Sequence, residues 1–319
     1  MKIGLDVLGG DFAPKATMHG AILARKELPE SDQIVLIGDR EVIHAFLREE
    51  KVDPGNFEIV DAPDLIEMDE QPTKALINKP NSSISVGFRM LKHKEIHAFA
   101  GAGSSGAMMV GAIYTVNTVQ GIIRPATTAY IPKENGGTSV LIDVGTNPDA
   151  KPDVMYQFGI LGSLFAEHVF HIKKPRVGLL NIGSEEKKGS LTAQSAFQLM
   201  KDSKDYHFVG NVEGRELFRD NVDVIVCDGF VGNIVLKQVE ALYRVMIKRG
   251  IKDSYLDRFN YENYGGTPIL GINSTVLVGH GISNANAIRR MILMAKEVHE
   301  ARLSQKIKHA LERYSPNNI

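Results

Sequence analysis

Residues 101–112 read GAGSSGAMMVGA, and a short apolar run at 96–100 comes directly before them. An apolar stretch long enough for a helix comes directly after the glycine and serine turn. The order strand, turn, helix is the building unit of α/β proteins. The segment therefore predicts one strand–turn–helix step, with a turn small enough either for a ligand or for close packing of the helix on the sheet.

The same alternation of strand and helix patterns extends along most of the chain. Apolar strand candidates occur at 2–7, 33–38, 57–62, 96–100, 138–145, 176–183, 206–211, 223–230 and 274–281. A long amphipathic helix pattern covers about 284–312, whereas 61–80 reads as a loop. We expect an α/β fold with a mostly parallel sheet covered by helices, either as a single domain over 1–319 or as two lobes sharing one continuous sheet.

The composition is that of a globular protein and excludes several classes. The net charge of −1 does not indicate a surface for nucleic acid. Cys227 is the single cysteine, so no intrachain disulfide can form, which is typical of the cytoplasm. No apolar run approaches the ~18 residues of a membrane span. The first residues, MKIGLDV, read as a strand and not as a signal peptide.

Polar residues collect directly after the predicted strands, where ligands bind in open α/β sheets. Seven such loops combine glycine with Asn, Asp, Ser, Lys or His, and we expect them to converge on one crevice. Glycine N–H groups and helix N-termini favour an anion there, and no H-E-x-x-H motif or cysteine cluster indicates zinc. The alternative is that these residues serve only turns and helix caps. The alternatives for Asp6, Asp11, Asp143 and Asp228 are that they orient donors, cap helices or hold a cation. The residues predicted to bind substrate or phosphate are Asp6, Gly9, Gly10, Asp11, Gly103, Ser104, Ser105, Gly106, Asn147, Asn181, Asn211 and Asp228.

A dinucleotide loop is one interpretation of the turn, because Gly101, Gly103 and Gly106 fit the pattern G-x-G-x-x-G. That pattern requires an acidic residue about 20 positions later, for the ribose hydroxyls. No Asp or Glu lies between Glu95 and Glu134. The sequence therefore argues against a nicotinamide-dependent dehydrogenase, and we expect no cofactor.

A serine hydrolase is the second interpretation, because Ser104, Asp228 and His280 follow the chain order of an α/β-hydrolase triad. No upstream segment resembles an oxyanion loop, and the Asn and Lys loops would have no task in such an enzyme. A backbone cradle for phosphate is the third interpretation. It uses all of the loops and needs no covalent nucleophile.

Seven motifs distributed in order over nearly the whole chain resemble one family. They are DVLGGDFAP (6–14), DVGTNPDAKPD (143–153), VGLLNIGSEEKKG (177–189), FVGNVEGRELF (208–218), VCDGFVGNIVLK (226–237), YENYGG (261–266) and GHGISNANA (279–287). Together they resemble the PlsX family, the bacterial phosphate acyltransferases of phospholipid synthesis. The pair Ser104-Ser105 stands where that family usually has Asn-Thr.

The resemblance implies an enzyme that forms acyl-phosphate from acyl–acyl carrier protein and inorganic phosphate. It also implies a fold similar to phosphotransacetylases and to isocitrate and isopropylmalate dehydrogenases. Members of the family form homodimers, and their product passes to a membrane glycerol-3-phosphate acyltransferase. A cytoplasmic protein that associates with the membrane surface is the corresponding expectation.

Phosphate attack on a thioester needs mainly positioning and charge stabilisation. Lys188 is predicted to hold phosphate or the developing oxyanion, and Asn233 to orient the carbonyl or the phosphate. His280 is predicted to donate to the oxyanion or to the departing sulfur. A short amphipathic projection at about 237–264 combines basic and aromatic residues. It suits an acidic carrier protein, a membrane face or a dimer interface, and these alternatives stay open.

Overall fold

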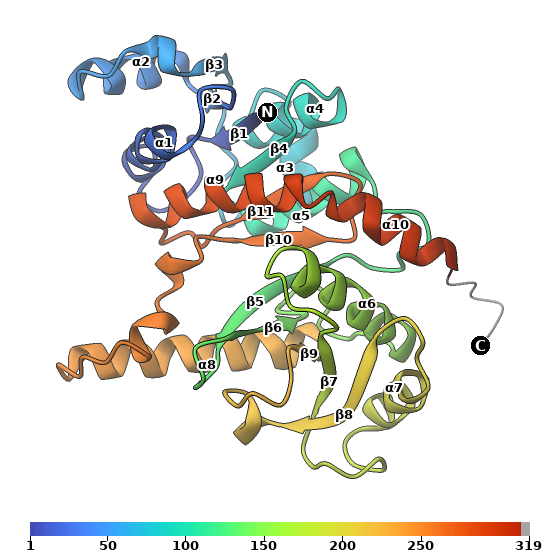
Figure 1. Ribbon diagram of the computed structural model, residues 1–319. Coiled ribbons are helices and arrows are strands. Elements are labelled where there is room, and N and C mark those ends of the chain that lie inside the picture. Colours follow the sequence, from blue (N-terminus) through green and yellow to red (C-terminus); the bar gives the residue numbers. More distant parts are fainter. Residues whose placement is uncertain (314–319) are drawn as a thin grey trace. The chain divides into compact units, whose positions relative to one another are not determined.

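The computed structural model describes residues 1–313 of the chain (Figure 1). The chain divides into two compact units. Unit 1 comprises Met1–Thr118 and Tyr261–Glu300, and unit 2 comprises Val119–Asn260 and Ala301–Ile319. The last six residues of the predicted 1–319 domain lie outside the described part of the chain.

Unit 1 contains six strands in the order β3-β2-β1-β4-β11-β10. The first five strands run parallel, whereas β10 pairs antiparallel with β11. Their bounds are β1 (Lys2–Asp6), β2 (Gln33–Gly38), β3 (Glu58–Asp61), β4 (Ala98–Gly101), β10 (Thr267–Leu270) and β11 (Thr275–Val278). The parallel arrangement brings the carboxyl ends of β1, β4 and β11 to one edge of the sheet.

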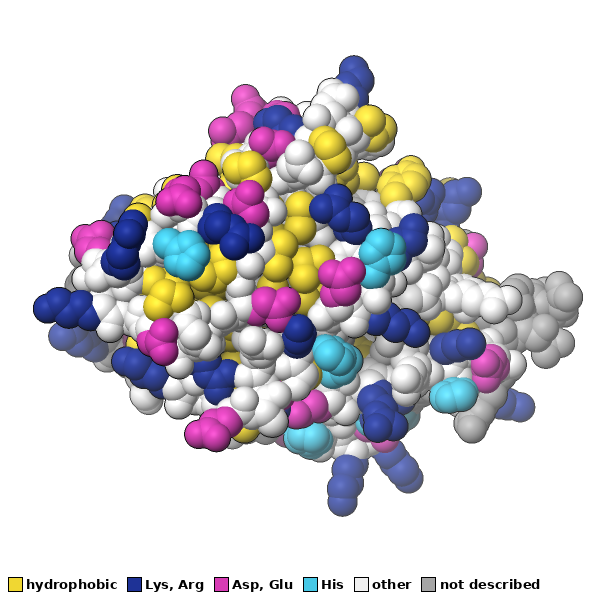
Figure 2. Space-filling view, turned by 90° about the horizontal axis from the view of Figure 1, so that it is seen from above, with side chains coloured by type: hydrophobic (Ala, Val, Ile, Leu, Met, Phe, Trp, Pro, Cys, Tyr) yellow, Lys and Arg dark blue, Asp and Glu magenta, His cyan; other side chains and the backbone are white. Residues whose placement is uncertain are grey.

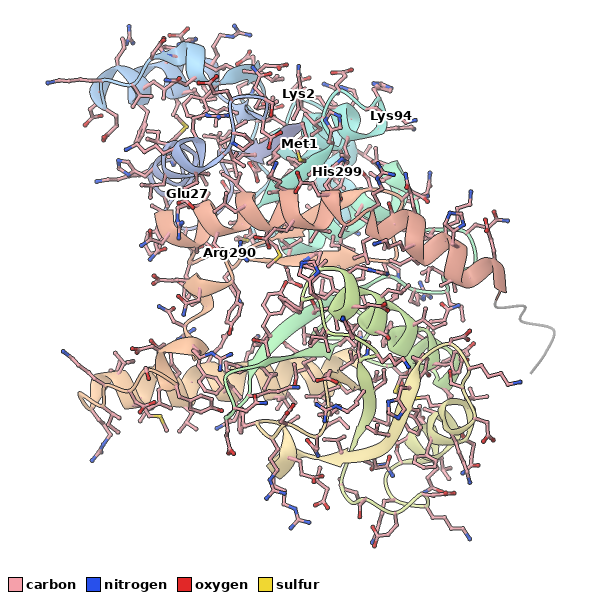
Figure 3. All side chains as sticks on the ribbon, viewed as in Figure 1. Met1, Lys2, Glu27, Lys94, Arg290 and His299 are labelled. Atoms are coloured by element: carbon pink, nitrogen blue, oxygen red, sulfur yellow. The ribbon has the colours of Figure 1, made fainter. Side chains whose placement is uncertain are left out.

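Helices cover the sheet of unit 1. They are α1 (Lys15–Glu27), α2 (Arg40–Glu49), α3 (Pro72–Asn78), α4 (Ser83–Lys92), α5 (Ser105–Gly111) and α9 (Ala285–Glu300), and a π-helical turn at Ala112–Val116 follows α5. Phe99 of β4 packs edge-to-face on Phe88 of α4, with ring centroids 5.2 Å apart. Helices α1 and α9 pack closely, since a Cβ at Gly20 would lie 2.5 Å from Ile288. Figure 3 labels Glu27 of α1, which pairs with Arg289 of α9.

The described part of unit 2 contains five strands in the order β5-β6-β9-β7-β8. Strand β5 pairs antiparallel with β6, and the remaining pairs are parallel. The strands are β5 (Ala126–Pro132), β6 (Thr138–Ile142), β7 (Arg176–Asn181), β8 (His207–Glu213) and β9 (Val224–Val226). The helices are α6 (Pro152–His168), α7 (Leu191–Lys201), α8 (Gly229–Lys248) and α10 (Leu303–Arg313), and short 3₁₀ turns lie at Gly214–Glu216 and Leu256–Phe259. Unit 1 has similar 3₁₀ turns at Pro54–Asn56 and Tyr261–Asn263.

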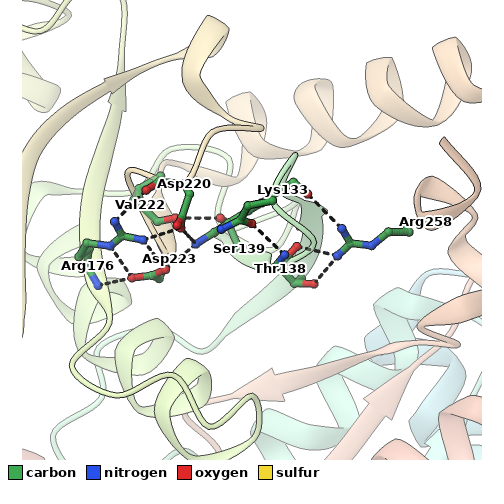
Figure 4. Close-up of polar contacts among 10 residues, drawn as sticks. Lys133, Thr138, Ser139, Arg176, Asp220, Val222, Asp223 and Arg258 are labelled. Carbon is green, nitrogen blue, oxygen red and sulfur yellow. Dashed lines mark hydrogen bonds and ion pairs between the residues drawn. The ribbon is translucent and has the colours of Figure 1, made fainter. Parts of the chain in front are cut away.

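A network of ion pairs closes the amino end of the unit 2 sheet (Figure 4). The buried Lys133 ammonium lies 2.5 Å from Asp223 and 3.0 Å from Asp220, and Arg176 pairs with both carboxylates. Burial alone would raise the pKa of Asp223, but hydrogen bonds from Arg176 and Lys133 hold that pKa well below its usual value. Arg258 donates to the carbonyl oxygens of Lys133 and Gly137, and so fixes the β5–β6 hairpin.

The predicted fold class is confirmed, with several local differences. Strands β5 and β10 were not predicted, and both are antiparallel strands that contain or end in proline. Helix α3 lies inside the predicted loop at 61–80. The predicted helix at 284–312 is two helices, because Arg302 adopts a left-handed conformation with φ of 51° between α9 and α10.

The surface carries charges of both signs. On the face shown in Figure 2, Lys and Arg side chains are interspersed with Asp and Glu side chains. This face has no large area of a single sign. None of the helices within residues 1–313 combines the length and the apolar character that crossing a membrane requires.

Candidate functional site

Three loops of unit 1 meet at the carboxyl ends of β1, β4 and β11. A Cβ at Gly9 would lie 2.6 Å from the backbone nitrogen of Gly103, so the β1–α1 loop touches the turn after β4. Gly10, with φ of +113°, lies against the carbonyl oxygen of Gly281, and Asp11 donates its N–H to the same oxygen at 2.7 Å. The close approach of these backbones is what requires glycine here.

The GAGSSGA turn starts helix α5, as predicted. Ser104 is its N-cap residue, and the hydroxyl accepts a hydrogen bond from the Ala107 N–H at 3.4 Å. Ser104 is only 3% exposed, whereas Ser105 faces solvent. A Cβ at Gly106 would lie 2.7 Å from Pro72, so this glycine serves the packing of α5 on α3. The turn therefore combines backbone approach at Gly103 with close helix packing at Gly106.

Asp6, the last residue of β1, is fully buried below this turn. Its Oδ1 accepts hydrogen bonds from the N–H groups of Leu8 and Gly9, at 3.1 Å each. Its Oδ2 has no hydrogen-bond partner within residues 1–313. Burial raises the pKa of Asp6 to about 6, against the smaller opposing effects of the Ser83 hydroxyl and the two N–H groups. A buried Asp6 can therefore take up a proton near neutral pH.

His280 lies in the loop after β11, and its side chain is exposed. Its ring packs edge-to-face on Tyr261, with centroids 5.4 Å apart. The adjoining Ser283 is buried and donates its N–H to the His280 carbonyl oxygen, so the loop closes as a tight turn at the start of α9. The exposed imidazole is able to reach a ligand, and its predicted catalytic role stays a prediction.

In unit 2, the loop after β6 and the first turn of α8 lie together. Asp143 is completely buried and accepts hydrogen bonds from the backbone N–H of Asn147 at 2.6 Å and from its side-chain amide at 3.0 Å. The Asn147 carbonyl oxygen accepts from the N–H of Gly229, the first residue of α8, at 2.8 Å. The Asn233 side chain, one turn further along α8, lies beside Gly145.

Asp228 is the N-cap residue of α8. Its carboxylate accepts a hydrogen bond from the Val231 N–H at 2.8 Å. Such a cap satisfies a free N–H group at the start of the helix and stabilises its dipole. Asp228 therefore has a structural task in α8, which was one of the alternatives for the acidic residues in these loops.

Asn181 and Asn211 bind the chain itself. The Asn181 amide donates to the Lys188 carbonyl oxygen and to the Asn211 side chain, both at 3.1 Å. The Asn211 amide donates to the Glu185 carbonyl oxygen at 2.9 Å. Asn211 also lies within strand β8, not in a loop after it. The two amides thus fix the 183–189 loop that carries Lys188, and this role was not visible in the sequence.

Lys188 is accessible from that loop. Its side chain is 49% exposed, and its ammonium lies 3.8 Å from the more exposed Glu185 carboxylate. An exposed pair of this kind contributes little stability. The Lys188 charge is therefore available to a dianion without breaking a strong interaction.

The serine hydrolase interpretation gains no support from the individual residues. The Ser104 hydroxyl is a buried helix cap, and Asp228 caps another helix. Cys227 is buried, and burial raises the pKa of its thiol well above the ordinary value, which disfavours the nucleophilic thiolate. Within residues 1–313, no group of three or more His, Cys, Asp or Glu side chains is arranged to hold a metal ion.

Comparison with known proteins identifies the family. A family model described as "Fatty acid synthesis protein" matches residues 1–306. A "Phosphate acyltransferase" from Pelotomaculum thermopropionicum is 41% identical over 332 aligned positions, which cover 98% of this chain and 95% of that protein. The chain belongs to the PlsX family of phosphate acyltransferases. It is an acyltransferase, as the motifs led us to expect.

Solved structures give this phosphate acyltransferase its fold relatives. A phosphotransacetylase from Streptococcus pyogenes has a TM-score of 0.64 at 16% identity and covers 93% of this chain and 94% of its own. A 4-hydroxythreonine-4-phosphate dehydrogenase from Klebsiella pneumoniae has a TM-score of 0.57 at 13% identity and covers 94% and 98%. These similarities confirm the predicted fold, shared by phosphotransacetylases and dehydrogenases.

Proposed function

We propose that this acyltransferase moves a fatty acyl group from acyl–acyl carrier protein to inorganic phosphate, and that the acyl-phosphate enters phospholipid synthesis. A phosphate oxygen attacks the thioester carbonyl carbon, and a tetrahedral oxyanion forms. The C–S bond then breaks, so that the carrier thiol leaves and acyl-phosphate remains. The observation that carries the proposal is the near-complete alignment with proteins named phosphate acyltransferase.

The chemistry asks little of acids and bases. Phosphate is substantially dianionic near neutral pH, and a thiolate with a pKa near ~8.5 leaves readily. The protein has to position the two reactants and stabilise the oxyanion. In unit 2, the accessible Lys188 would hold the phosphate charge, and Asn233 would orient the carbonyl or the phosphate. In unit 1, the exposed His280 would donate to the oxyanion or to the sulfur.

We also propose that the enzyme works as a homodimer. Helix α8 supports this, because it exposes apolar side chains over several turns: Phe230, Val231, Ile234, Leu242, Val245 and Ile247. A second copy would cover such a face. The basic residues of the same segment also suit an acidic carrier protein. A membrane surface is the third alternative for this segment. A cytoplasmic enzyme that hands acyl-phosphate to a membrane glycerol-3-phosphate acyltransferase fits these features.

Purified protein, acyl carrier protein loaded with a long acyl chain, and phosphate form the direct test. Acyl-phosphate is trapped with hydroxylamine, and we expect a product that depends on phosphate. The absence of such a product with every chain length would refute the proposal. We expect Lys188→Ala and Asn233→Ala each to reduce the turnover number more strongly than they reduce the stability of the fold. Lys188→Ala loses a charge-assisted contact, and Asn233→Ala loses an orienting contact.

A further inference from the structure

The Asp143 carboxylate has no capacity left for a substrate. Its Oδ1 accepts from the N–H and the hydroxyl of Thr127, at 3.0 and 3.2 Å, and from the Val144 N–H at 2.8 Å. Its Oδ2 accepts from the two donors of Asn147. A carboxylate offers about four lone-pair sites, and at least five donors already face this one. Since Asp143 is also 0% exposed, any effect on chemistry must pass through the residues it holds.

Those hydrogen bonds join three segments that are distant in sequence. Thr127 lies in β5, and Asn147 lies in the loop after β6, where its amide also donates to the Pro125 carbonyl oxygen at 2.8 Å. The third segment is the first turn of α8. It is held through the Asn147 carbonyl oxygen, which accepts from Gly229.

Two glycines of α8 show how closely its first turn lies against this carboxylate. A Cβ at Gly229 would lie 2.7 Å from Oδ2 of Asp143, and a Cβ at Gly232 would overlap the Asp143 carbonyl oxygen. The position of α8 therefore depends on the position of Asp143. Asn233 directly follows Gly232, so its side chain is set by the same contact.

We propose that Asp143 is the positioning residue of the unit 2 site: it fixes the 143–147 loop and the first turn of α8, and thereby sets Asn233 for the transfer step. This inference rests on the proposed function. It adds a residue that does not touch the substrate. It also explains why this fully hydrogen-bonded carboxylate lies at the carboxyl end of the sheet, whereas the ion pairs of Asp223 lie at the amino end.

Asp143→Asn keeps the size of the side chain but turns one acceptor oxygen into a donor that faces other donors. We expect kcat for phosphate-dependent transfer, corrected for the folded fraction, to fall ~10- to 100-fold. The KM values for phosphate and acyl carrier protein should change less than ~3-fold, because the binding groups remain. A fall in kcat of less than fivefold in the folded variant would overturn the proposal.

Asp223→Asn is the matched control, because it replaces a buried carboxylate at the opposite end of the same sheet. It removes ion pairs with Lys133 and Arg176, so we expect a lower melting temperature and a corrected kcat within ~2-fold of wild type. An equal loss of corrected kcat in both variants would show a general effect of destabilisation and would overturn the assignment.

Two further measurements cover the remaining outcomes. If Asp143→Asn does not fold, Thr127→Val replaces it as the test, because it removes only the hydroxyl hydrogen bonds to Asp143 and Thr146. A ~5-fold loss of kcat at unchanged stability supports the proposal, whereas an unchanged kcat overturns it. If the wild type forms no acyl-phosphate, the proposed function fails instead. Hydrogen exchange then decides the inference: it should be faster at Asn147 and Gly229 in Asp143→Asn and unchanged there in Asp223→Asn, and equal exchange would refute the positioning role.

Discussion

Asp6 in unit 1 and Asp143 in unit 2 occupy matching places in their sheets. Each ends or directly follows a parallel strand, is completely buried, and is followed by valine and a glycine-containing loop. Each also lies against a glycine at the start of the helix after the neighbouring strand: Gly103 before α5 and Gly229 in α8. The sequence stretches around the two residues therefore look alike.

Their hydrogen-bond donors differ. Asp143 accepts hydrogen bonds on both oxygens, from Thr127 in β5 and from Val144 and Asn147 in the loop after β6, whereas the N–H groups that donate to Asp6 belong to its own loop and lie on one oxygen. Burial accordingly raises the pKa of Asp6 to about 6. Matching places in the two sheets therefore do not give two buried carboxylates the same hydrogen-bond donors. At Asp6 the few donors on one oxygen do not offset the effect of burial on its pKa.

The largest expected effect follows from the glycines that approach the two carboxylates. A Cβ at Gly232 would overlap the Asp143 carbonyl oxygen, and a Cβ at Gly9 would overlap Oδ2 of Asp6. We expect Gly232→Ala and Gly9→Ala each to cost about 3 kcal/mol or more in urea unfolding. At Gly232, which lies in α8, this is the net cost after the ~1 kcal/mol that alanine gains over glycine in a helix. Gly214→Ala, with open space around it, is the control and should stay within about 0.5 kcal/mol of wild type.

Asparagine at the two positions separates the carboxylates directly. Asp143→Asn at pH 7.5 should cost about 3 kcal/mol, because charge-assisted hydrogen bonds are lost and donors face a donor. Asp6→Asn should leave stability equal or higher, because the Oδ2 that it replaces has no hydrogen-bond partner within residues 1–313. Urea unfolding of both variants checks this, and equal losses would contradict the difference in donors.

The pH dependence of stability sharpens the comparison for Asp6. The folded protein holds the Asp6 proton up to about pH 6, and the unfolded chain releases it near 3.8. The stabilising contribution is therefore complete below about pH 4 and is lost as the pH rises to 6, by about 2 to 3 kcal/mol. The free energy of unfolding of wild type should fall over this window relative to Asp6→Asn. Parallel pH profiles of the two proteins would show that the Asp6 proton is not linked to folding.

The smallest effect concerns the helix caps in the same two places. The cap on α5 is the 3.4 Å bond to the Ser104 hydroxyl, and the cap on α8 is the 2.8 Å bond to the Asp228 carboxylate. We expect Ser104→Ala to cost about 0.5 kcal/mol and Asp228→Ala about 1 to 2 kcal/mol in thermal unfolding. Ser104→Ala should also retain phosphate-dependent turnover within ~3-fold. A loss of turnover above 100-fold at unchanged stability would restore Ser104 as a nucleophile.

The sequence predicted the strands and loops that carry strong local patterns. Each of the nine strand candidates overlaps a strand, and the turn before α5 was placed correctly, because alternation, glycine and small residues act over short distances. The candidate at 223–230 was too long, since β9 ends at Val226 and α8 begins at Gly229. Strands β5 (ATTAYIP) and β10 (TPIL) were missed because both contain proline and pair antiparallel with their neighbours. The break at Arg302 was missed because nothing in the helical pattern requires it.

The candidate site divides in the same way. Glycine-rich turns and helix caps follow from residue type, so the loops with Ser104 and Asp228 could be located. The tasks of Asn181 and Asn211 could not, because their partners are backbone carbonyl oxygens of the 183–189 loop. The donors around Asp143 come from Thr127, Val144 and Asn147, and only the folded chain brings Thr127 near.

The two-part composition of unit 1 has a consequence during synthesis on the ribosome. Strand β4 ends at Gly101, but its neighbour β11 begins at Thr275, 174 residues later. At about 5 to 20 residues per second, the nascent chain carries an incomplete unit 1 for roughly 10 to 35 seconds. Throughout that interval the side of β4 that later pairs with β11 is an open edge with unpaired N–H and C=O groups, while the five strands of unit 2, the last of which ends at Val226, are being made. The newly made protein is therefore most exposed to aggregation through β4, and a chaperone that shields this edge would matter most before β11 is made.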